Sequence, residues 1–289
     1  MKRPLFRYCL PLHFTLLAAT FFISHALKAQ DEPVTPAAAK PSVIPTDING
    51  LKTIIGGPES IRPIRVALYD GPGSGDGGVD NVESSAHQIE GVTVTRLTPA
   101  EISTINLSSR FDVVVFSGGS GSAQSKAIGE AGRVNIRDFI KNGGGYVGVC
   151  AGAYLACAGY DWGLGILDAK TVSSKWRRGR AFLDIELTPA GRDIFGPVDG
   201  TFKVRYANGP VIKPLNRDDI PDYTPVSIFR TETAENDTPA GVQVGAPSQA
   251  IGTFGKGRVF ISSPHPENTP GLENMIPRAL LWAAANPAK

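Results

Sequence analysis

From about residue 64 onward, short apolar runs alternate with amphipathic stretches along the 289-residue chain. Continuous apolar runs are typical of parallel strands that are buried on both faces, whereas apolar positions three and four apart predict helices. Buried strands are predicted at 64–70, 92–97, 111–116, 145–149 and 259–262. Helices are predicted at 79–89, 99–105, 131–142, 150–157 and 272–285. Strands that alternate with helices predict a doubly wound, mostly parallel α/β sheet of flavodoxin-like type.

The pattern changes beyond residue 163, where short β-like segments alternate with turn residues. These segments lie at 163–167, 171–172, 181–187, 202–206, 225–229, 241–244 and 250–254. They predict an antiparallel β-meander inserted into the parallel sheet. The whole of 62–289 is then one domain, because about 225 residues are enough to bury one large core.

The N-terminal region has a different composition. Lys2, Arg3 and Arg7 precede an apolar run at 8–27 that contains no acidic residue, which is typical of a secretory signal peptide over residues 1–29. A retained membrane anchor is the alternative, since the length of the run is borderline. We expect an exported protein, periplasmic or extracellular, without a stable membrane span after cleavage. Residues 30–61, rich in Pro and Ala, are predicted to be a flexible linker.

Removal of this leader changes the charge and the inventory of reactive side chains. It leaves 25 basic and 27 acidic residues, so the net charge moves from +2 to about −2, and a nucleic acid or an anionic membrane is not expected as a partner. Two cysteines, Cys150 and Cys157, and two histidines, His87 and His265, remain. Their spacing does not predict a metal site. The Gly-rich loop at 71–78 lacks the dinucleotide-binding spacing, so no cofactor is expected.

The segment 143–156 carries the strongest chemical signal. Cys150 stands between an apolar strand and the small residues that open a helix, with glycines at positions 148 and 152. This arrangement predicts a nucleophile elbow, a strained turn that presents the sulfur at a helix N-terminus, where the thiolate is favoured. The alternative is a buried structural cysteine beside a Gly-rich turn. Cys157 lies about 10 Å along the predicted helix from Cys150, too far for a disulfide.

A histidine and a carboxylate follow the last predicted strand. A nucleophilic thiol needs a base, and the base needs an orienting acid. Glu267 is two residues beyond His265, so in an extended chain both side chains point to the same side. The sequence therefore predicts that Cys150, His265 and Glu267 act together.

The order Gly-x-Cys-x-Gly followed by His-Pro-Glu resembles the class I glutamine amidotransferases, and within them the biotin-protein ligase N-terminal domain family. The resembling segments are 69–73, 116–120, 143–156, 175–179, 206–210 and 265–267. The resemblance implies a Cys150, His265 and Glu267 triad. It also implies an oxyanion hole formed by the N–H groups of Gly119 and Ala151.

Four further positions are candidates for substrate binding: Asp70, Gly118, Trp176 and Tyr206. Asp70 ends the first strand, and either meets a polar substrate group or caps the following loop. Gly118 belongs to a Gly-Gly pair that either gives the oxyanion hole its freedom or forms an ordinary tight turn. Trp176 lies in a basic cluster that either grips an acidic substrate or is a solvated hairpin tip. Tyr206 lies near the site by resemblance.

Three functions fit these residues. The first is a cysteine hydrolase of amidotransferase-like type, acting on a small-molecule or peptide amide or a related acyl compound. The second is a non-catalytic module of the same family that binds a small molecule or peptide. The third is a thiol sensor based on Cys150. The sequence contains no synthetase or biotin-ligase catalytic pattern, so simple hydrolysis is expected rather than ammonia or biotin transfer. It specifies neither the acyl group nor the oligomeric state.

Overall fold

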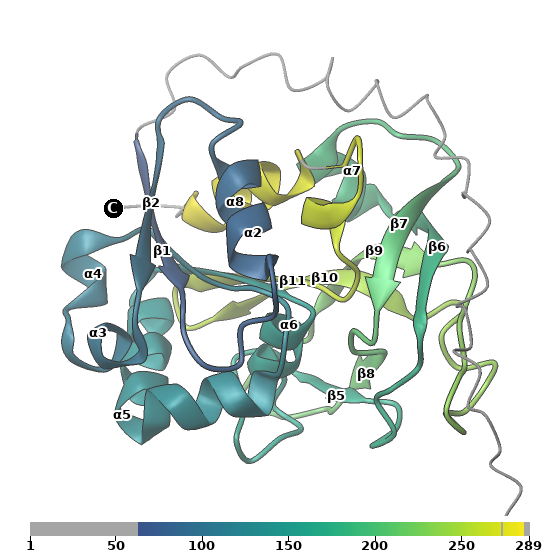
Figure 1. Cartoon of the computed structure of the whole chain (residues 1–289), viewed down its shortest axis with the longest axis horizontal. Coiled ribbons are helices and arrows are strands. Elements are labelled where there is room, and N and C mark those ends of the chain that lie inside the picture. Colours follow the sequence, from purple (N-terminus) through teal and green to yellow (C-terminus); the bar gives the residue numbers. More distant parts are fainter. Residues whose placement is uncertain (1–62, 273, 286–289) are drawn as a thin grey trace, which may run out of the picture. The chain divides into compact units, whose positions relative to one another are not determined.

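The computed structural model describes residues 63–272 and 274–285 (Figure 1). The predicted leader at 1–29 and the predicted linker at 30–61 lie outside the described residues. Within the described ranges, no helix is long and apolar enough to cross a bilayer.

One nine-stranded sheet organises the domain, in the order β2-β1-β3-β4-β11-β10-β9-β6-β7. The first five strands in this order are mutually parallel, and the last four continue the sheet as antiparallel neighbours. The strands are β1 (Ile64–Tyr69), β2 (Val92–Leu97), β3 (Val113–Phe116), β4 (Gly145–Val149), β6 (Arg180–Leu187), β7 (Thr201–Ala207), β9 (Thr224–Phe229), β10 (Pro247–Phe254) and β11 (Gly257–Ser262). A separate two-stranded sheet pairs β5 (Ala169–Thr171) with β8 (Ile212–Pro214).

Helices cover both faces of the sheet (Figure 1). On one face lie α2 (Gly78–Ala86), α7 (Pro189–Phe195) and α8 (Met275–Ala284). On the other lie α3 (Pro99–Thr104), α4 (Leu107–Arg110), α5 (Gly121–Lys141) and α6 (Ala151–Ala156). A short 3₁₀ helix, η2 (Pro266–Asn268), follows β11.

The apolar strands fill two cores because successive side chains point to opposite faces. Along β1, Val66 and Leu68 join the core beneath α2, α7 and α8, whereas Ala67 and Tyr69 join the core beneath α3 to α6. The central strands are therefore buried on both sides, as their continuous apolar runs indicated. This confirms the doubly wound α/β class.

The structure differs from the predicted elements at several places, and it adds α4, α7 and β8, which were not predicted. Helix α5 starts ten residues earlier than predicted, where Ser120 accepts from the Ala123 N–H as an N-cap, and it contains a kink at Gly129 with φ +64°. Helix α6 ends at Ala156, one residue before the predicted end, because Cys157 is already extended. The predicted strands at 163–167 and 241–244 are wrong. Residues 163–167 make only an isolated β-bridge, through Leu167. Residues 241–244 form a turn, and both Gly241 and the following Gly245 have positive φ.

Candidate active site

Cys150 occupies the strained turn that the sequence predicted. It joins β4 directly to α6, with φ +50° and ψ −94°, a conformation that few L-residues adopt. The neighbouring glycines are required by space. A Cβ at Gly148 would lie 2.5 Å from the Gly152 carbonyl oxygen, and a Cβ at Gly152 would lie 2.2 Å from that of Phe116. The close packing of β3, β4 and α6 therefore holds the nucleophile elbow in place.

His265 reaches the same edge of the sheet because β11 runs parallel to β4. The register pairs Ser262 with Val149, and the Cys150 N–H donates to the Ser262 carbonyl at 2.8 Å. The chain beyond each strand thus emerges beside the other. Gly118, at the end of β3, lies between them: a Cβ there would be 2.7 Å from His265 Cε1 and 3.7 Å from Cys150 Cβ.

Glu267 is paired with His265, with 2.7 Å between Oε1 and Nδ1. The predicted pairing is present, but the predicted extended chain is wrong, since Glu267 lies in η2 and helical curvature brings its carboxylate back to the ring. Both groups are buried, with Glu267 5% and His265 8% exposed. An acid held in this way fixes the orientation of the imidazole.

The charged form of His265 is stabilised from two sides. Burial opposes a charge on the ring, but the nearby Cys150 sulfur and the Glu267 carboxylate outweigh it and raise the pKa of His265 from 6.5 to about 10. The ring's Nε2 is buried without a hydrogen-bond partner in the described part of the chain. The arrangement therefore favours a charged imidazolium beside Cys150 at neutral pH.

The two N–H groups predicted as oxyanion donors are available. Gly119 has φ +136°, and a Cβ there would lie 2.1 Å from the Gly73 carbonyl oxygen, so the position requires glycine. The flanking bonds join Gly75 N–H to the Gly118 carbonyl and Ser120 N–H to the Gly73 carbonyl, each at 2.8 Å. Over the described ranges neither the Gly119 nor the Ala151 N–H donates to a backbone carbonyl.

The segment 206–210, expected near the site by resemblance, lies against the cysteine. The carbonyl oxygen of Ala207 is 3.5 Å from the Cys150 sulfur, and the Tyr154 hydroxyl of α6 donates to the carbonyl of Asn208 at 3.1 Å. Asn208 has φ +58°, and its side-chain oxygen accepts from the Gly179 N–H at 2.8 Å. Asn208 thereby connects the basic segment at 175–180 to α6, the helix that follows Cys150. The Asn-Gly pair in the sequence, which is typical of turns, could have indicated this connection.

The four predicted substrate-binding residues occupy different environments. Gly118 touches the imidazole, as described above. Asp70 pairs with Arg96 at 3.4 Å, beside Asp80 and Glu83. Trp176 is 49% exposed, with the Arg177 guanidinium 5.0 Å from its ring centroid. Tyr206 is fully buried and donates to the Gly209 carbonyl at 2.7 Å.

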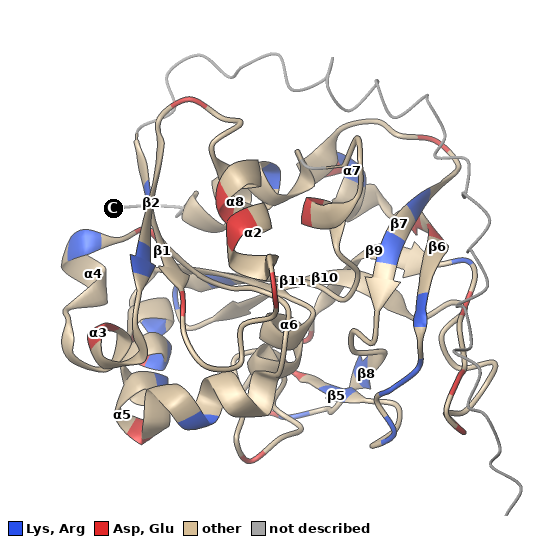
Figure 2. Cartoon of the chain, viewed as in Figure 1, with Lys and Arg blue, Asp and Glu red and all other residues tan. Residues whose placement is uncertain are grey.

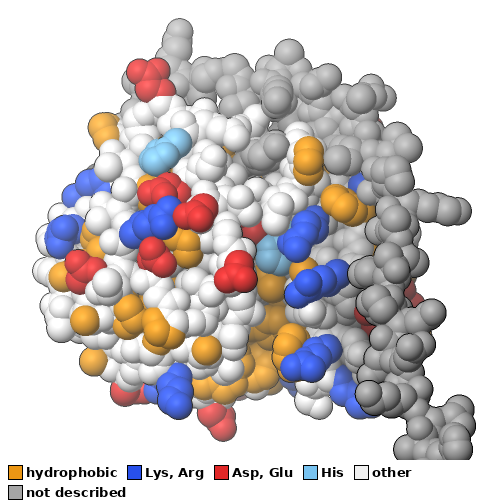
Figure 3. Space-filling view, in the orientation of Figure 1, with side chains coloured by type: hydrophobic (Ala, Val, Ile, Leu, Met, Phe, Trp, Pro, Cys, Tyr) orange, Lys and Arg blue, Asp and Glu red, His pale blue; other side chains and the backbone are white. Residues whose placement is uncertain are grey.

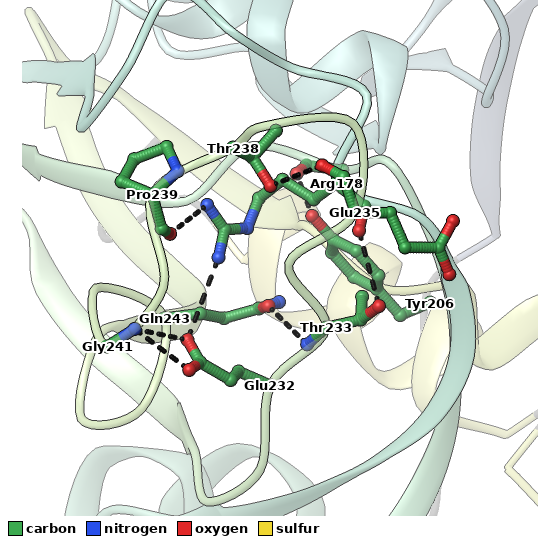
Figure 4. A network of polar contacts seen from close by, with 10 residues as sticks. Arg178, Tyr206, Glu232, Thr233, Glu235, Thr238, Pro239, Gly241 and Gln243 are labelled. Atoms are coloured by element: carbon green, nitrogen blue, oxygen red, sulfur yellow. Dashed lines mark hydrogen bonds and ion pairs between the residues drawn. The ribbon is translucent and has the colours of Figure 1, made fainter.

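Arg178 holds one wall of the site, the basic segment at 175–180, through a buried polar network (Figure 4). It is 2% exposed, donates to the Pro239 carbonyl at 3.0 Å and lies 3.7 Å from the Glu232 carboxylate. Its own carbonyl accepts from Glu235 N–H and Thr233 Oγ1. The network fixes the segment that carries Trp176 against the loop at 232–243.

Cys157 does not share these features. It is fully buried, it is a free thiol like Cys150, and burial raises its pKa to about 12. Among the residues that the structure describes, no cluster of three or more metal-ligating side chains is present. His87 is the exposed C-cap of α2.

Comparisons with known proteins bear on the family and the fold of the chain. Residues 64–178 match the sequence profile of the family described as Biotin-protein ligase, N terminal. The matched region contains Cys150, Gly118 and Gly119 but ends before His265 and Glu267. No curated protein sequence matches the chain.

Solved structures share the fold at low sequence identity. PurLQS from Thermotoga maritima is 13% identical with a TM-score of 0.52, covering 78% of this chain and 98% of its own. A cytoplasmic protein of Salmonella typhimurium LT2, STM1381, is also 13% identical, with a TM-score of 0.51 and coverage of 76% and 99%. A putative ThuA-like protein from Parabacteroides merdae is 13% identical, with a TM-score of 0.50 and coverage of 79% and 93%. Residues 64–178 thus match the biotin-protein ligase N-terminal family, on a class I glutamine amidotransferase-like fold, as the sequence indicated.

Proposed function

We propose that the protein is a cysteine-dependent hydrolase that acts on an amide or related acyl substrate. The observation that supports this most directly is the position of His265, which touches Gly118 beside Cys150 and is held by Glu267 at 2.7 Å. A binding module has no need for a buried, charge-stabilised imidazole next to a strained cysteine.

In the proposed reaction, the Cys150 thiolate attacks the acyl carbon, and the C–N bond breaks after the tetrahedral intermediate forms. The N–H groups of Gly119 and Ala151 donate hydrogen bonds to the oxyanion. His265 gives its proton to the departing amine, which leaves a thioester on Cys150. Water then gives a proton to His265 and attacks the thioester, which releases the carboxylic acid and restores the thiolate.

Thiol labelling tests the first requirement of this proposal. Cys150 is also buried, but it is 5% exposed and lies beside His265, whereas Cys157 is fully enclosed. Iodoacetamide near pH 7 should therefore alkylate Cys150 much faster than Cys157. The change His265→Ala should slow Cys150 labelling by about 10²-fold, the scale of a lost acid–base partner. Equal labelling of the two thiols would favour the alternative, a non-catalytic module that binds a small molecule or peptide.

A substrate screen tests turnover. Simple amides, γ-glutamyl compounds and cell-wall peptides would be offered to the native protein and to Cys150→Ala, with release of amine as the readout. Amine release that depends on Cys150 supports the hydrolase. Binding without release in both proteins supports the module. Export through the N-terminal segment is part of the proposal, and fractionation of the producing cells tests it.

A further inference from the structure

A row of aromatic side chains extends from the nucleophile helix. Tyr154 lies four residues after Cys150, and its ring centroid is 6.2 Å from that of Tyr160. Tyr160 in turn stacks on Trp162, with centroids 4.5 Å apart and planes at 24°. All three side chains are only partly buried. Partly exposed rings in series form a surface on which planar or apolar groups of a ligand can stack.

Both ends of this aromatic row are connected to the candidate site. At one end, the Tyr154 hydroxyl bonds to the Asn208 carbonyl in the loop that touches Cys150. At the other, a Cβ at Gly121, in the first turn of α5, would be 3.3 Å from the Trp162 ring. Figure 3 shows a hollow on this face in which hydrophobic side chains continue downward from a central histidine. The row therefore runs beside the candidate site, from the loop that touches Cys150 to the first turn of α5.

One side of the hollow is basic. Between residues 169 and 183 the sequence has five basic residues and no acidic one. Arg178 is neutralised by Glu232, but within the described ranges Lys175, Arg177 and Arg180 are exposed and make no ion pair. Figures 2 and 3 show Lys and Arg along this side of the hollow, on β6, β7 and the connection from β5, whereas Asp and Glu gather mainly on the other side.

The basic side and the aromatic row are held next to each other. The Asn208 side chain accepts from the Gly179 N–H, and its carbonyl accepts from Tyr154. Tyr160 is hydrogen-bonded to Thr171 of β5 at 2.8 Å. A ligand lying on the rings therefore also faces the exposed cations.

We infer that this hollow, the groove between the aromatic row and the basic side, binds an acidic peptide. Side chains of the peptide stack on Tyr154, Tyr160 and Trp162. Its carboxylates meet Lys175, Arg177 and Arg180. The inference rests on the proposed hydrolase, since it names the class of amide that the groove delivers to Cys150. An acidic peptide fits better than a neutral ligand because these three cations have no carboxylate partner within the described chain, and the Arg177 guanidinium lies over the Trp176 ring.

Peptide binding to the full chain tests the inference. The probe is a fluorescein-labelled octapeptide of alternating Glu and Phe, and fluorescence anisotropy is measured with Cys150→Ala to prevent cleavage. Replacement of Glu by Gln, or of Phe by Ala, in the peptide should weaken binding at least fivefold. These two arms change only the probe, so they do not depend on how a protein variant folds.

Protein variants locate the binding. The triple change Lys175→Glu, Arg177→Glu and Arg180→Glu should weaken binding at least tenfold. The matched control uses three other exposed cations, Arg110, Lys141 and Lys256. They precede β3, β4 and β11, and so lie at the amino ends of these strands, opposite the candidate site. Their reversal to Glu should leave affinity within twofold. Tyr160→Leu and Trp162→Leu should each weaken binding severalfold.

Three results would overturn the inference: equal binding of the Glu and Gln peptides, equal effects of the two triple reversals, or preference for a neutral oligosaccharide. Failure of the proposed hydrolase is separate. An unreactive Cys150 with intact, charge-dependent peptide binding would remove only the hydrolase, whereas a reactive Cys150 without peptide binding would remove only the groove.

Discussion

The parallel and antiparallel halves of the sheet contribute to the site in different ways. In the parallel half, β3, β4 and β11 end at one edge, and their backbones alone place Gly118, Cys150 and His265 together. In the antiparallel half, the segment at 175–180 and the loop at 206–210 are held by individual polar bonds. Reactivity therefore depends on space between packed backbones, whereas the walls depend on replaceable contacts. Substitutions in the two halves should separate these properties.

Gly118→Ala should have the largest effect on reactivity. A methyl group would lie 2.7 Å from His265 Cε1, so the imidazole must move away from Cys150. Misplacing a catalytic group by about 1 Å costs on the order of 10²-fold in rate. We expect this loss in iodoacetamide labelling and in any amide hydrolysis, while the melting temperature changes little because the site is at the edge of the core.

Gly78→Ala is the matched control for this prediction. Gly78 begins α2, and Ser117 follows β3 directly. A Cβ at Gly78 would meet Ser117 Oγ at 3.4 Å, which is an ordinary contact. Labelling should stay within about twofold, since nothing moves toward His265. Equal losses in the two variants would mean that the effect is not transmitted through the imidazole.

Arg178→Met should give the largest loss of stability in the antiparallel half. The change removes the donor to the Pro239 carbonyl and leaves Glu232 without its cation. Breaking such a pair costs about 3 kcal/mol where it is buried, and somewhat less here because Glu232 is partly exposed. Urea unfolding should show this decrease, while Cys150 labelling of the folded protein stays near native. Arg177→Met, the exposed neighbour, should change stability by less than about 0.5 kcal/mol.

The reactive half was predictable from sequence because its signals are local. The glycines around Cys150 report the close approach of β3, β4 and α6, and apolar runs place those strands in a parallel sheet whose ends meet. His265 and Glu267 were recognised by chemistry and spacing. Even so, the curvature of η2 that joins them was missed, since Pro266 is compatible with both extended and helical backbone.

The walls were less predictable because their contacts join residues far apart in the chain. The Asn208 side chain meets Gly179, 29 positions away, and Arg178 meets Pro239, 61 positions away. Neither pairing leaves a periodic pattern. The aromatic row was missed for a related reason: Tyr154 lies in a helix that ends after six residues, and Tyr160 and Trp162 lie beyond its end, where no spacing rule applies. Antiparallel order is similarly hidden, since β6 lies beside β9 as well as β7.

Glu267→Gln should lower the pKa of His265. The carboxylate stabilises the charged ring, so its removal favours the neutral form, and the pKa should fall from about 10 toward its usual value of 6.5. NMR titration of labelled histidines measures the change, and exposed His87 serves as the internal reference. Cys150→Ala should lower the pKa in the same direction. A ring that titrates near 6.5 in the native protein would contradict the stabilisation of the charged imidazolium by these two neighbours.

Less stabilisation of the charged His265 ring should also lower the rate at which Cys150 is alkylated. With Glu267→Gln, labelling of Cys150 near pH 7 should fall about tenfold, the equivalent of roughly 1.4 kcal/mol. The loss is smaller than for Gly118→Ala because the ring keeps its place in the packed edge. An unchanged rate together with a lowered pKa would separate orientation of the ring from its charge.

Asn208→Gly should have the smallest effect, and it tests the junction between the two halves. Glycine adopts the φ of +58° without strain but removes the oxygen that accepts from the Gly179 N–H. The basic segment should then hold its place less well, and affinity for the Glu-Phe peptide should fall a few fold, as expected for one hydrogen bond worth about 1 kcal/mol. Asn208→Asp keeps both the acceptor and tolerance of this backbone conformation. It should therefore bind like the native protein, apart from a modest loss from the added negative charge.

Labelling of Cys150 should stay within about twofold in both variants, because the elbow is fixed by the backbones of the parallel half. A large loss of labelling in Asn208→Gly alone would show instead that the antiparallel half sets the position of the nucleophile.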